Sequence, residues 1–432
     1  MPLNVATIYS TLGNPNSLIP LAVKDVSATT GMTAGSFVTG KEEGVDRLID
    51  EVGTQIIWLG GIPISKAIYN ALVFKTAKFD HKFDPRNLKD KDIFEKIKQY
   101  APDEKIKNEL EKISNKEKLF KNLVSTRFVV STALTIASYL FLTKFKQKYT
   151  EKKIRQNLIN EYNKQQEQQK NKENNNDLLP DNTTNPNFKG IGPMVEKFAF
   201  SPVRNMWILD GAITTARLAD SRTPQEFVGY SIKEFATLFF LYYAGGKIQD
   251  LMVKNAKVKH NKTIGLDARA IENDSLKKAF ENGSIQKSLE EFKAANTSKA
   301  NLYEFLHKNP DNLIVQVAKL SDVIKLYNKT EKIDVRKYID LDEIESINKN
   351  ITELYNEYKG AIKDGHSSEE FFNGVKKLKR KSIRANIGAS IFALGIITPA
   401  IMLAKRIVGK DDTEFQTKKE IRQQLINEGL IA

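Results

Sequence analysis

Four apolar stretches interrupt an otherwise polar chain, and each comes close to the length of a membrane-spanning helix. They are Val52–Phe74, Leu123–Thr143, Phe227–Gly246 and Ala385–Val408. About 20 consecutive apolar residues cross the hydrocarbon core of a bilayer as a helix. The pattern therefore predicts an all-α fold, a multi-helix integral membrane protein, although the mean hydropathy of -0.42 is typical of a soluble chain.

The second stretch is the clearest of the four. It carries no charge from Phe128 to Thr143, and a basic cluster, Lys144–Lys153, follows it directly. Small side chains recur along it, and such residues let helices approach one another closely in lipid. These residues are Ser131, Ala133, Thr135, Ala137 and Ser138. We expect this stretch to be a genuine span.

The first and fourth stretches contain residues that disturb helices. Gly60 and Pro63 lie in the first, and Gly395 and Pro399 occupy similar places in the fourth. Because proline removes a backbone hydrogen bond and kinks a helix, these four positions are the expected kinks. Both segments share the pattern Gly-x-x-Ile-x-x-Leu-Gly, which fits either an internal transporter repeat or a chance match between membrane helices. A broken helix in the membrane interface is the alternative for the first stretch.

The segment Ser201–Gly246 predicts a helical hairpin that turns near Arg222. With that turn, Asp210 would face Lys233 and Glu234 across two antiparallel helices. Ionisable residues inside a membrane segment must pair or line water, which makes these three charges the candidate functional residues. The alternative is that the hairpin lies at the interface or against the soluble part, with the three residues on a solvated face.

The polar regions complete a division of the chain into six segments. Residues 1–44 are a polar N-terminal arm with a short helix around Leu18–Val26, and residues 151–190 are a Gln- and Asn-rich linker, expected to be disordered because it has little apolar surface to bury. Residues 45–150 hold two membrane helices and a charged helical connection, and residues 191–250 hold the hairpin. Residues 251–384 form a soluble helical domain, and residues 385–432 hold the last apolar helix and a polar tail.

The soluble segment 251–384 is lysine-rich and contains an apolar seam with alternating spacings of three and four residues, the pattern of a coiled coil. The seam residues are Ile344, Ile347, Ile351, Leu354 and Tyr358. Because the run is short, we expect an intramolecular helical hairpin instead of a long coiled coil. This Lys-rich domain is the expected contact region for a protein partner.

Basic residues exceed acidic ones by 67 to 53, which gives a net charge of +14. The densest basic clusters, Lys144–Arg155 and Lys376–Arg384, lie beside apolar stretches, which favours anionic lipid headgroups as the partner. The sequence lacks a basic stripe interleaved with base-stacking aromatic residues, so no nucleic-acid partner is expected. Four spans would place 75–122 and 251–384 on one side. Their lysines favour the cytoplasm, whereas the Lys144 cluster argues against it.

No catalytic or cofactor motif accompanies these patterns. The chain has no cysteine, which excludes disulfides, thiolate catalysis and cysteine-ligated metals. The four histidines are far apart in the sequence, so no metal site is expected. They are His81, His260, His307 and His366. We therefore expect neither an enzyme nor a cofactor.

Two classes of function remain open after these exclusions. The favoured one is a non-enzymatic, membrane-anchored helical scaffold or interaction protein, multi-pass and located in a bacterial inner membrane. The alternative is a small channel or transporter that uses the kinked helices and the charges Asp210, Lys233 and Glu234. A soluble bundle of unusually apolar helices is a third interpretation.

Overall fold

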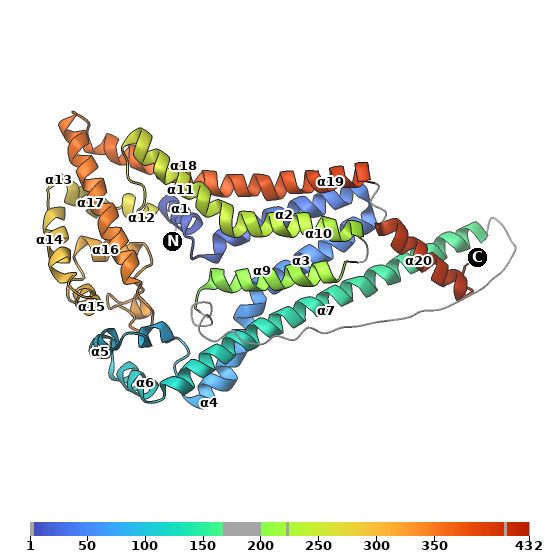
Figure 1. Cartoon of the computed structure of the whole chain (residues 1–432), viewed down its shortest axis with the longest axis horizontal. Helices are drawn as coiled ribbons and strands as arrows, with labels where there is room; N and C mark the ends of the chain where they lie inside the picture. Colours follow the sequence, from blue (N-terminus) through green and yellow to red (C-terminus); the bar gives the residue numbers. More distant parts are fainter. Residues whose placement is uncertain (1–3, 167–199, 222–223, 410–412, 432) are drawn as a thin grey trace.

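The computed structural model describes residues 4–166, 200–221, 224–409 and 413–431. Within these ranges the regular structure is helical, apart from one isolated bridge between Leu326 and Ile333, which confirms the predicted all-α class. Long helices run side by side along the molecule, and a domain of shorter helices lies at one end of them (Figure 1). We call this end of the long helices the domain end, and the opposite end the far end.

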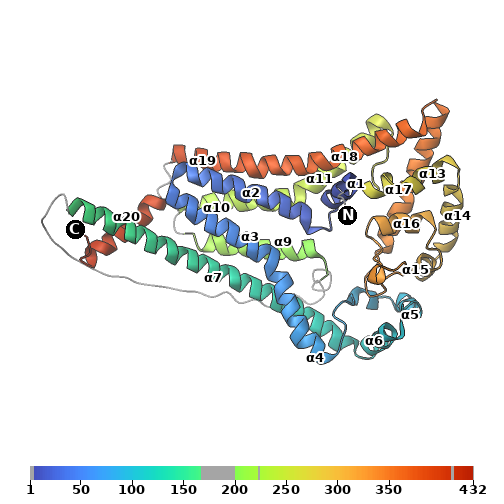
Figure 2. The ribbon, with the colours of Figure 1, turned by 180° about the vertical axis from the view of Figure 1, so that it is seen from behind.

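Six long helical segments form a bundle. They are α2 (Leu18–Thr39), α3 (Lys41–Tyr69), α7 (Glu117–Gln166), α9 (Pro202–Ala219), α10 with α11 (Pro224–Leu238 and Gly245–His260), and α18 with α19 (Ser368–Phe392 and Thr398–Gly409). Each contacts the next around a closed ring, in the order α2, α3, α7, α9, α10, α19 and back to α2. The view from behind shows the same parallel course of these helices (Figure 2). The ring therefore has an interior of its own.

Three of these segments contain a π-helical turn. The turns are η1 (Asn70–Phe74) after α3, η3 (Phe239–Ala244) between α10 and α11, and η5 (Ala393–Ile397) between α18 and α19. Of the predicted kinks, Gly395 lies inside η5 and Pro399 directly follows it. Gly60 and Pro63 lie inside α3, which stays α-helical as far as Tyr69.

The interpretation of residues 1–44 as a loose arm is wrong. The chain forms α1 (Val5–Gly13) and then the full-length α2, which begins where the Ser17 hydroxyl accepts a hydrogen bond from the Ile19 amide at 3.2 Å. Two glycines serve close packing between helices. A Cβ atom added to Gly31 would overlap the carbonyl oxygen of Gly395, and one added to Gly61 would lie 2.5 Å from the Thr135 side chain.

Residues on both sides of the second apolar stretch build one helical domain. Its elements are α4 (Lys75–Ala77), η2 (Pro85–Leu88), α5 (Lys91–Gln99), α6 (Glu104–Asn115), α12 (Ala268–Ile271), α13 (Asp274–Glu281), α14 (Ile285–Ala295), α15 (Lys299–Lys308), α16 (Leu313–Leu320), η4 (Tyr327–Lys329) and α17 (Leu341–Lys363). A single core runs from Phe74 to Val375 in sequence. Arg336 pairs with Asp80 at 3.2 Å across the two parts. Segments 75–122 and 251–384 thus contribute to one common core.

The predicted seam of α17 packs inside this domain. All five seam residues are buried in the shared core, where α17 contacts α15, α16 and α18. Tyr358, for example, meets Phe371 of α18 edge-on with ring centroids 5.5 Å apart. The expected intramolecular packing is therefore present, in a core that involves several helices. The coiled coil itself is not confirmed.

The start of the Gln- and Asn-rich linker is helical. Helix α7 continues through Gln166, and Ile154 and Leu158 on its last turns pack against α20 (Thr413–Asn427) at the far end. Interpretation of residues 151–166 as a disordered linker is therefore wrong, because Ile154, Leu158 and Tyr162, spaced four residues apart, belong to one apolar cluster. Residues 167–190 of the predicted linker lie outside the described residues.

His307 is a half-buried histidine in the helical domain. Its ring stacks on Tyr100 with centroids 4.5 Å apart, and its Nε2 atom has no hydrogen-bond partner among the described residues. Burial lowers the pKa of His307 to about 4. In the unfolded chain the His307 imidazole therefore binds a proton near pH 6.5. In the folded domain it binds this proton only at a much lower pH.

We expect the domain to lose about 2 kcal/mol of stability between pH 7 and pH 5 through His307 alone. His307→Phe, which keeps a ring and removes the titration, should flatten this pH dependence in denaturant unfolding curves. His260→Asn, at an exposed histidine, is the control and should leave it unchanged. An equal pH slope in the wild type and in His307→Phe would contradict the assignment.

Candidate functional site

Three helices of the described chain are long and apolar enough to cross a membrane. They span Gly44–Ala77, Glu117–Asn163 and Ser368–Lys405, and they contain the first, second and fourth predicted stretches. The third stretch, Phe227–Gly246, is not among them, because Lys233 and Glu234 interrupt its apolar run and turn toward the interior of the ring. The length and composition of three helices are thus compatible with a membrane.

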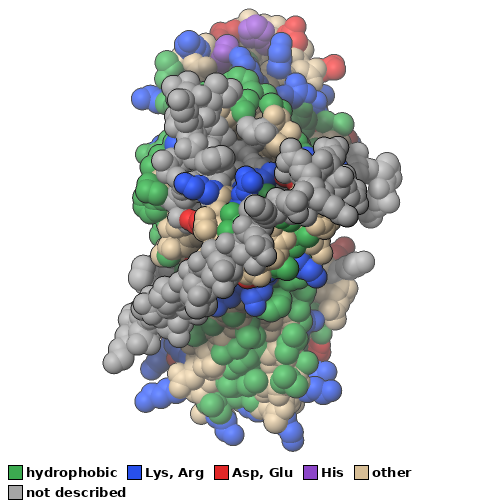
Figure 3. Space-filling model, turned by 90° about the vertical axis from the view of Figure 1, so that its right-hand side faces the viewer, with side chains coloured by type: hydrophobic (Ala, Val, Ile, Leu, Met, Phe, Trp, Pro, Cys, Tyr) green, Lys and Arg blue, Asp and Glu red, His purple; other side chains and the backbone are tan. Residues whose placement is uncertain are grey.

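Apolar side chains cover the outside of the bundle. Seen from the far end, hydrophobic side chains reach the surface in patches between Lys and Arg side chains (Figure 3). Large exposed residues recur along the outer faces of the candidate spans: Ile56, Ile64 and Ile68 on α3, Leu72 on η1, Val129, Leu134, Phe141 and Phe145 on α7, and Phe392, Ile396 and Ile401 on the C-terminal segment. The bundle therefore presents to its surroundings the residues that a water-soluble protein usually buries.

The interior of the ring is charged, and Arg217 of α9 is its centre. This residue is 6% exposed. Its guanidinium donates to the Tyr139 hydroxyl at 2.9 Å and the Thr54 hydroxyl at 3.1 Å. It also pairs with Asp50 at 3.4 Å and with Glu234. One side chain thus connects α9 to α3, α7 and α10, and its planar fork of donors suits several acceptors at once.

Lys233 extends the network toward α3. Its ammonium lies 2.6 Å from a carboxylate oxygen of Glu51 and 3.3 Å from one of Glu234. Both Lys233 and Glu234 are buried, and Glu51 is buried too. Opposite charges attract each other strongly in a low-dielectric interior, but a buried charge that loses its partner destabilises the fold. The pairs therefore make these helices depend on one another.

Lys146 and Arg47 complete the network at its far end. Lys146 of α7 lies within 4.0 Å of Asp50 and 3.7 Å of Asp46, and Arg47 contacts Glu51 at 3.4 Å. Tyr139 is five residues, or about 8 Å of helix, from the basic cluster that begins at Lys144. The network accordingly lies nearer the far end than the domain end.

The predicted pairing of Asp210 with Lys233 is replaced by other contacts. Asp210 accepts a hydrogen bond from the hydroxyl of Tyr242 in η3, while Lys233 pairs with Glu51 and Glu234. The predicted hairpin paired the correct two helices, α9 and α10. It could not include α3, whose acidic residues attract Lys233. All three predicted charges nevertheless line one cavity.

Two small polar cavities adjoin the network. The larger, about 30 Å³, lies among α2, α3, α9 and α10, and the smaller, about 10 Å³, lies toward the far end. Arg217 lines both of them. A cavity of the larger size holds one or two waters or a small ion, and it is too small for an organic solute.

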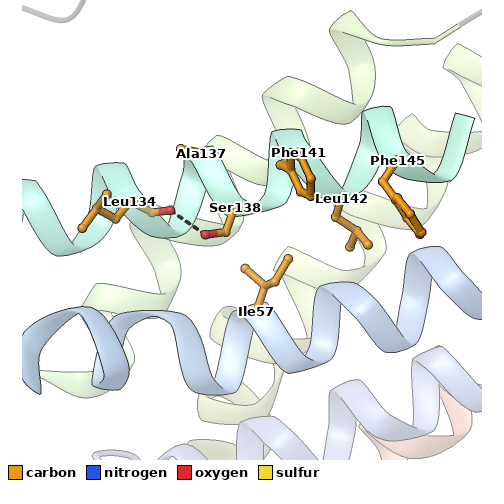
Figure 4. A pocket seen from close by; sticks show the side chains of 7 residues that line it. All are labelled: Ile57, Leu134, Ala137, Ser138, Phe141, Leu142 and Phe145. Carbon is orange, nitrogen blue, oxygen red and sulfur yellow. Dashed lines mark hydrogen bonds between the residues drawn. The ribbon is translucent and has the colours of Figure 1, made fainter. Parts of the chain in front are cut away.

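A much larger hollow lies on the outside of the bundle. About 510 Å³ in volume, it is open and is lined by Ile57 of α3 and by six residues of α7 from Leu134 to Phe145 (Figure 4). Its single hydroxyl, that of Ser138, donates to the Leu134 carbonyl at 2.9 Å. The hollow therefore offers an apolar ligand surface area without directional polar groups, which suits a hydrocarbon chain.

The small residues of α7 divide between two faces. Ser131 and Thr135 are buried against neighbouring helices, whereas Ala133, Ala137 and Ser138 face outward. The helix–helix contact predicted from this spacing thus involves the hydroxyl residues, whose side chains donate to the carbonyls of Phe128 and Ser131.

No group of histidine, cysteine and acidic side chains suited to a metal ion occurs within the described ranges. The sequence interpretation missed most of the network, including Asp50, Glu51, Lys146 and Arg217. A signal for two of them was present, since Asp50 and Glu51 stand directly at the edge of the first apolar stretch. Arg217 gave none, because helix α9 does not resemble a span.

Comparison of the chain with family models, with curated proteins and with solved structures finds no match.

Proposed function

We propose that the protein is a non-enzymatic membrane scaffold, a multi-pass helical bundle that holds a Lys-rich helical domain beside the bilayer. The observation that carries this proposal is the inverted distribution of side chains in the bundle, with charges such as Arg217 inside and large apolar residues such as Leu134 outside. Lipid solvates an apolar exterior, and buried ion pairs join the helices. The bacterial inner membrane stays our prediction for the location.

The lengths of the uncharged helix segments support the proposal that the bundle crosses a membrane. On α7 no charge separates Arg127 from Lys144, and on the C-terminal segment none separates Arg384 from Lys405. These intervals correspond to about 26 Å and 32 Å of helix, close to the 30 Å of a hydrocarbon core.

The basic clusters support contact with anionic headgroups at both ends of the bundle. Lys144, Lys148 and Lys152 are exposed at the far end, and Lys377 and Lys381 are exposed at the domain end. Other members have structural roles: Lys146 belongs to the interior network, Lys379 donates to the Ile264 carbonyl at 3.1 Å, and Arg380 binds Glu272. The exposed members form one stripe on each helix, spaced four residues apart.

Insertion of the bundle across a membrane can be tested by side-specific labelling, because the chain has no cysteine of its own. Single cysteines at Lys148, Arg204 and Lys377 all replace exposed side chains. In sealed vesicles, an impermeant maleimide should label position 148 from one side, and positions 204 and 377 from the other. Labelling of all three from one side would contradict a bundle that crosses the bilayer.

The position of Arg204 makes this test sharp. Gln166 ends α7 at the far end, whereas Pro202 begins α9 at the domain end (Figure 1). The sequence between these two residues is rich in Asn and Gln and favours water over hydrocarbon. A polar stretch whose flanking helices end and begin at opposite ends of the bundle is the observation that most favours the soluble interpretation.

A substitution on the lipid-facing surface gives a second test. Leu134 is 49% exposed in the middle of the uncharged part of α7. Leu134→Arg should cost about 2.5–3.5 kcal/mol of insertion free energy and shift the protein out of the carbonate-resistant membrane fraction. Leu119→Arg is the matched control, because Leu119 is 48% exposed on the same helix but outside the uncharged part. Equal behaviour of the two variants would place Leu134 in water.

The alternative, a small channel or transporter, is favoured by one specific observation, the charged axis of a closed helix ring. The cavities along it exclude organic solutes by size, so only a small ion could use it. Ion flux into proteoliposomes distinguishes the two functions. We expect no flux above that of empty vesicles, and a flux abolished by Glu234→Gln would favour the channel or transporter instead.

A further inference from the structure

The larger interior cavity has an unbalanced set of charges. Its lining includes four acidic side chains, Asp25, Glu51, Asp210 and Glu234, but only two basic ones, Arg217 and Lys233. Glu51 and Glu234 are paired with the two bases. Asp25 and Asp210 are therefore left as two carboxyl groups that have no basic partner of their own among the residues that the structure describes. In a confined site such a surplus has to be neutralised by something that the side chains do not supply.

Two polar atoms that line the same cavity have no hydrogen-bond partner among the described residues. They are the side-chain oxygen of Gln55 and the hydroxyl of Thr237. Thr237 is 9% exposed. Buried polar atoms are almost always satisfied, so unpaired ones that meet at a cavity indicate a small polar occupant.

The neighbours of the two carboxyls differ. The amide nitrogen of Gln55 on α3 donates to Asp25, and it also donates to the Thr29 hydroxyl at 3.1 Å. Tyr242 in η3 donates to Asp210. The other charged groups of the lining are the paired ones on α3, α9 and α10, and no titratable residue of η5 or α19 belongs to this lining within the described chain. Each surplus carboxyl thus has a neutral donor and no cation.

The polar path to this cavity comes from the far end. The smaller cavity on the other side of Arg217 is lined by Lys146, Gln147 and Asp220, and Asp220 is exposed. Toward the domain end the apolar residues Met206, Leu209 and Leu241 are buried, together with the polar residues Lys24, Asn205 and Asn386. The path from the far end leads past Arg217 to Asp25 and Asp210.

From these observations we propose that the cavity between Asp25 and Asp210 is a binding site for one small monovalent cation, a proton with its water or Na⁺, which enters from the far end. The site rests on the membrane-embedded bundle proposed above only for its direction of access. Carboxylate, amide and hydroxyl oxygens suit Na⁺, and the same carboxyls can accept a proton. A scaffold that binds such an ion would respond to the ionic conditions on one side of the membrane.

The test is labelling of the detergent-solubilised full-length protein with dicyclohexylcarbodiimide, followed by peptide mass spectrometry. This apolar carbodiimide adds to a protonated carboxyl group. We expect an adduct on Asp25 or Asp210 and none on Asp250, an exposed carboxyl on α11. The adduct should decrease as the pH rises, because each pH unit above the titration midpoint lowers the protonated fraction about ten-fold.

Repeating the reaction in NaCl and in choline chloride of the same ionic strength separates the two cations. Suppression of the adduct by Na⁺ alone identifies a Na⁺ site, and an adduct that depends on pH but not on Na⁺ identifies a proton site. Equal labelling of Asp25, Asp210 and Asp250, or no adduct at any pH, would overturn the proposal. Either result would leave the cysteine-labelling test of membrane insertion unaffected.

A variant removes the remaining ambiguity about folding. Asp210→Asn keeps the shape of the side chain and the contact with Tyr242 while it removes one surplus charge. We expect it to fold, to lose its own adduct and to change the pH or Na⁺ dependence of labelling at Asp25. Unchanged labelling of Asp25 in this variant would show that the two carboxyls do not share one site.

Discussion

Replacing Arg217 with methionine is expected to destabilise the bundle by about 3–5 kcal/mol, because it removes one member of a buried ion network and leaves the others in place. Asp50 keeps weaker contacts with Lys146 and Arg47, but Glu234 loses its main partner, and the hydroxyls of Tyr139 and Thr54 lose a donor. Thermal unfolding of the detergent-solubilised protein measures the loss.

Arg204→Met is the matched control for this prediction. Arg204 is on the same helix, α9, but its side chain is exposed. Its replacement should change stability by no more than about 0.5 kcal/mol. The double variant Arg217→Met with Glu234→Gln should recover part of the loss, since it removes one of the unpaired charges. A wild-type melting curve for Arg217→Met would mean that water reaches the network freely.

The second large effect is expected from the close contact of α2 with the C-terminal segment. In Gly31→Ala the added Cβ atom would overlap the Gly395 carbonyl oxygen and lie 2.9 Å from Cγ of Pro399. Because both obstacles belong to rigid backbone or a proline ring, the helices have to separate. We expect a loss of about 1–3 kcal/mol or more in the free energy of unfolding.

Gly35→Ala, one helical turn further along α2, is the control. The nearest atom to its added Cβ would be the Cβ atom of Pro399 at 3.8 Å, an ordinary van der Waals distance. This variant should be neutral or slightly stabilised, since alanine favours a helix by about 0.5–1 kcal/mol over glycine. Similar losses in Gly31→Ala and Gly35→Ala would show that the predicted close contact is not specific to Gly31.

The candidate site was predictable only in part. The sequence singled out Asp210, Lys233 and Glu234 because charges are rare within or beside apolar segments. It could not find Arg217 or Asp25, whose helices look too polar or too short to cross a membrane. It also gave Lys233 the wrong partner, because a hairpin fixes only the neighbours within two helices, and the true acceptor, Glu51, comes from a third.

The hydrophobic pattern alone determined the helical class and the places of three of the four predicted apolar helices, because local periodicity and length fix those features. Only the tertiary structure decided which faces meet. It joined residues 75–122 to 251–384 in one core, placed α2 in the ring through Gly31, and turned the charged faces inward around Arg217. These features depend on contacts between residues far apart in sequence, and no local pattern specifies them.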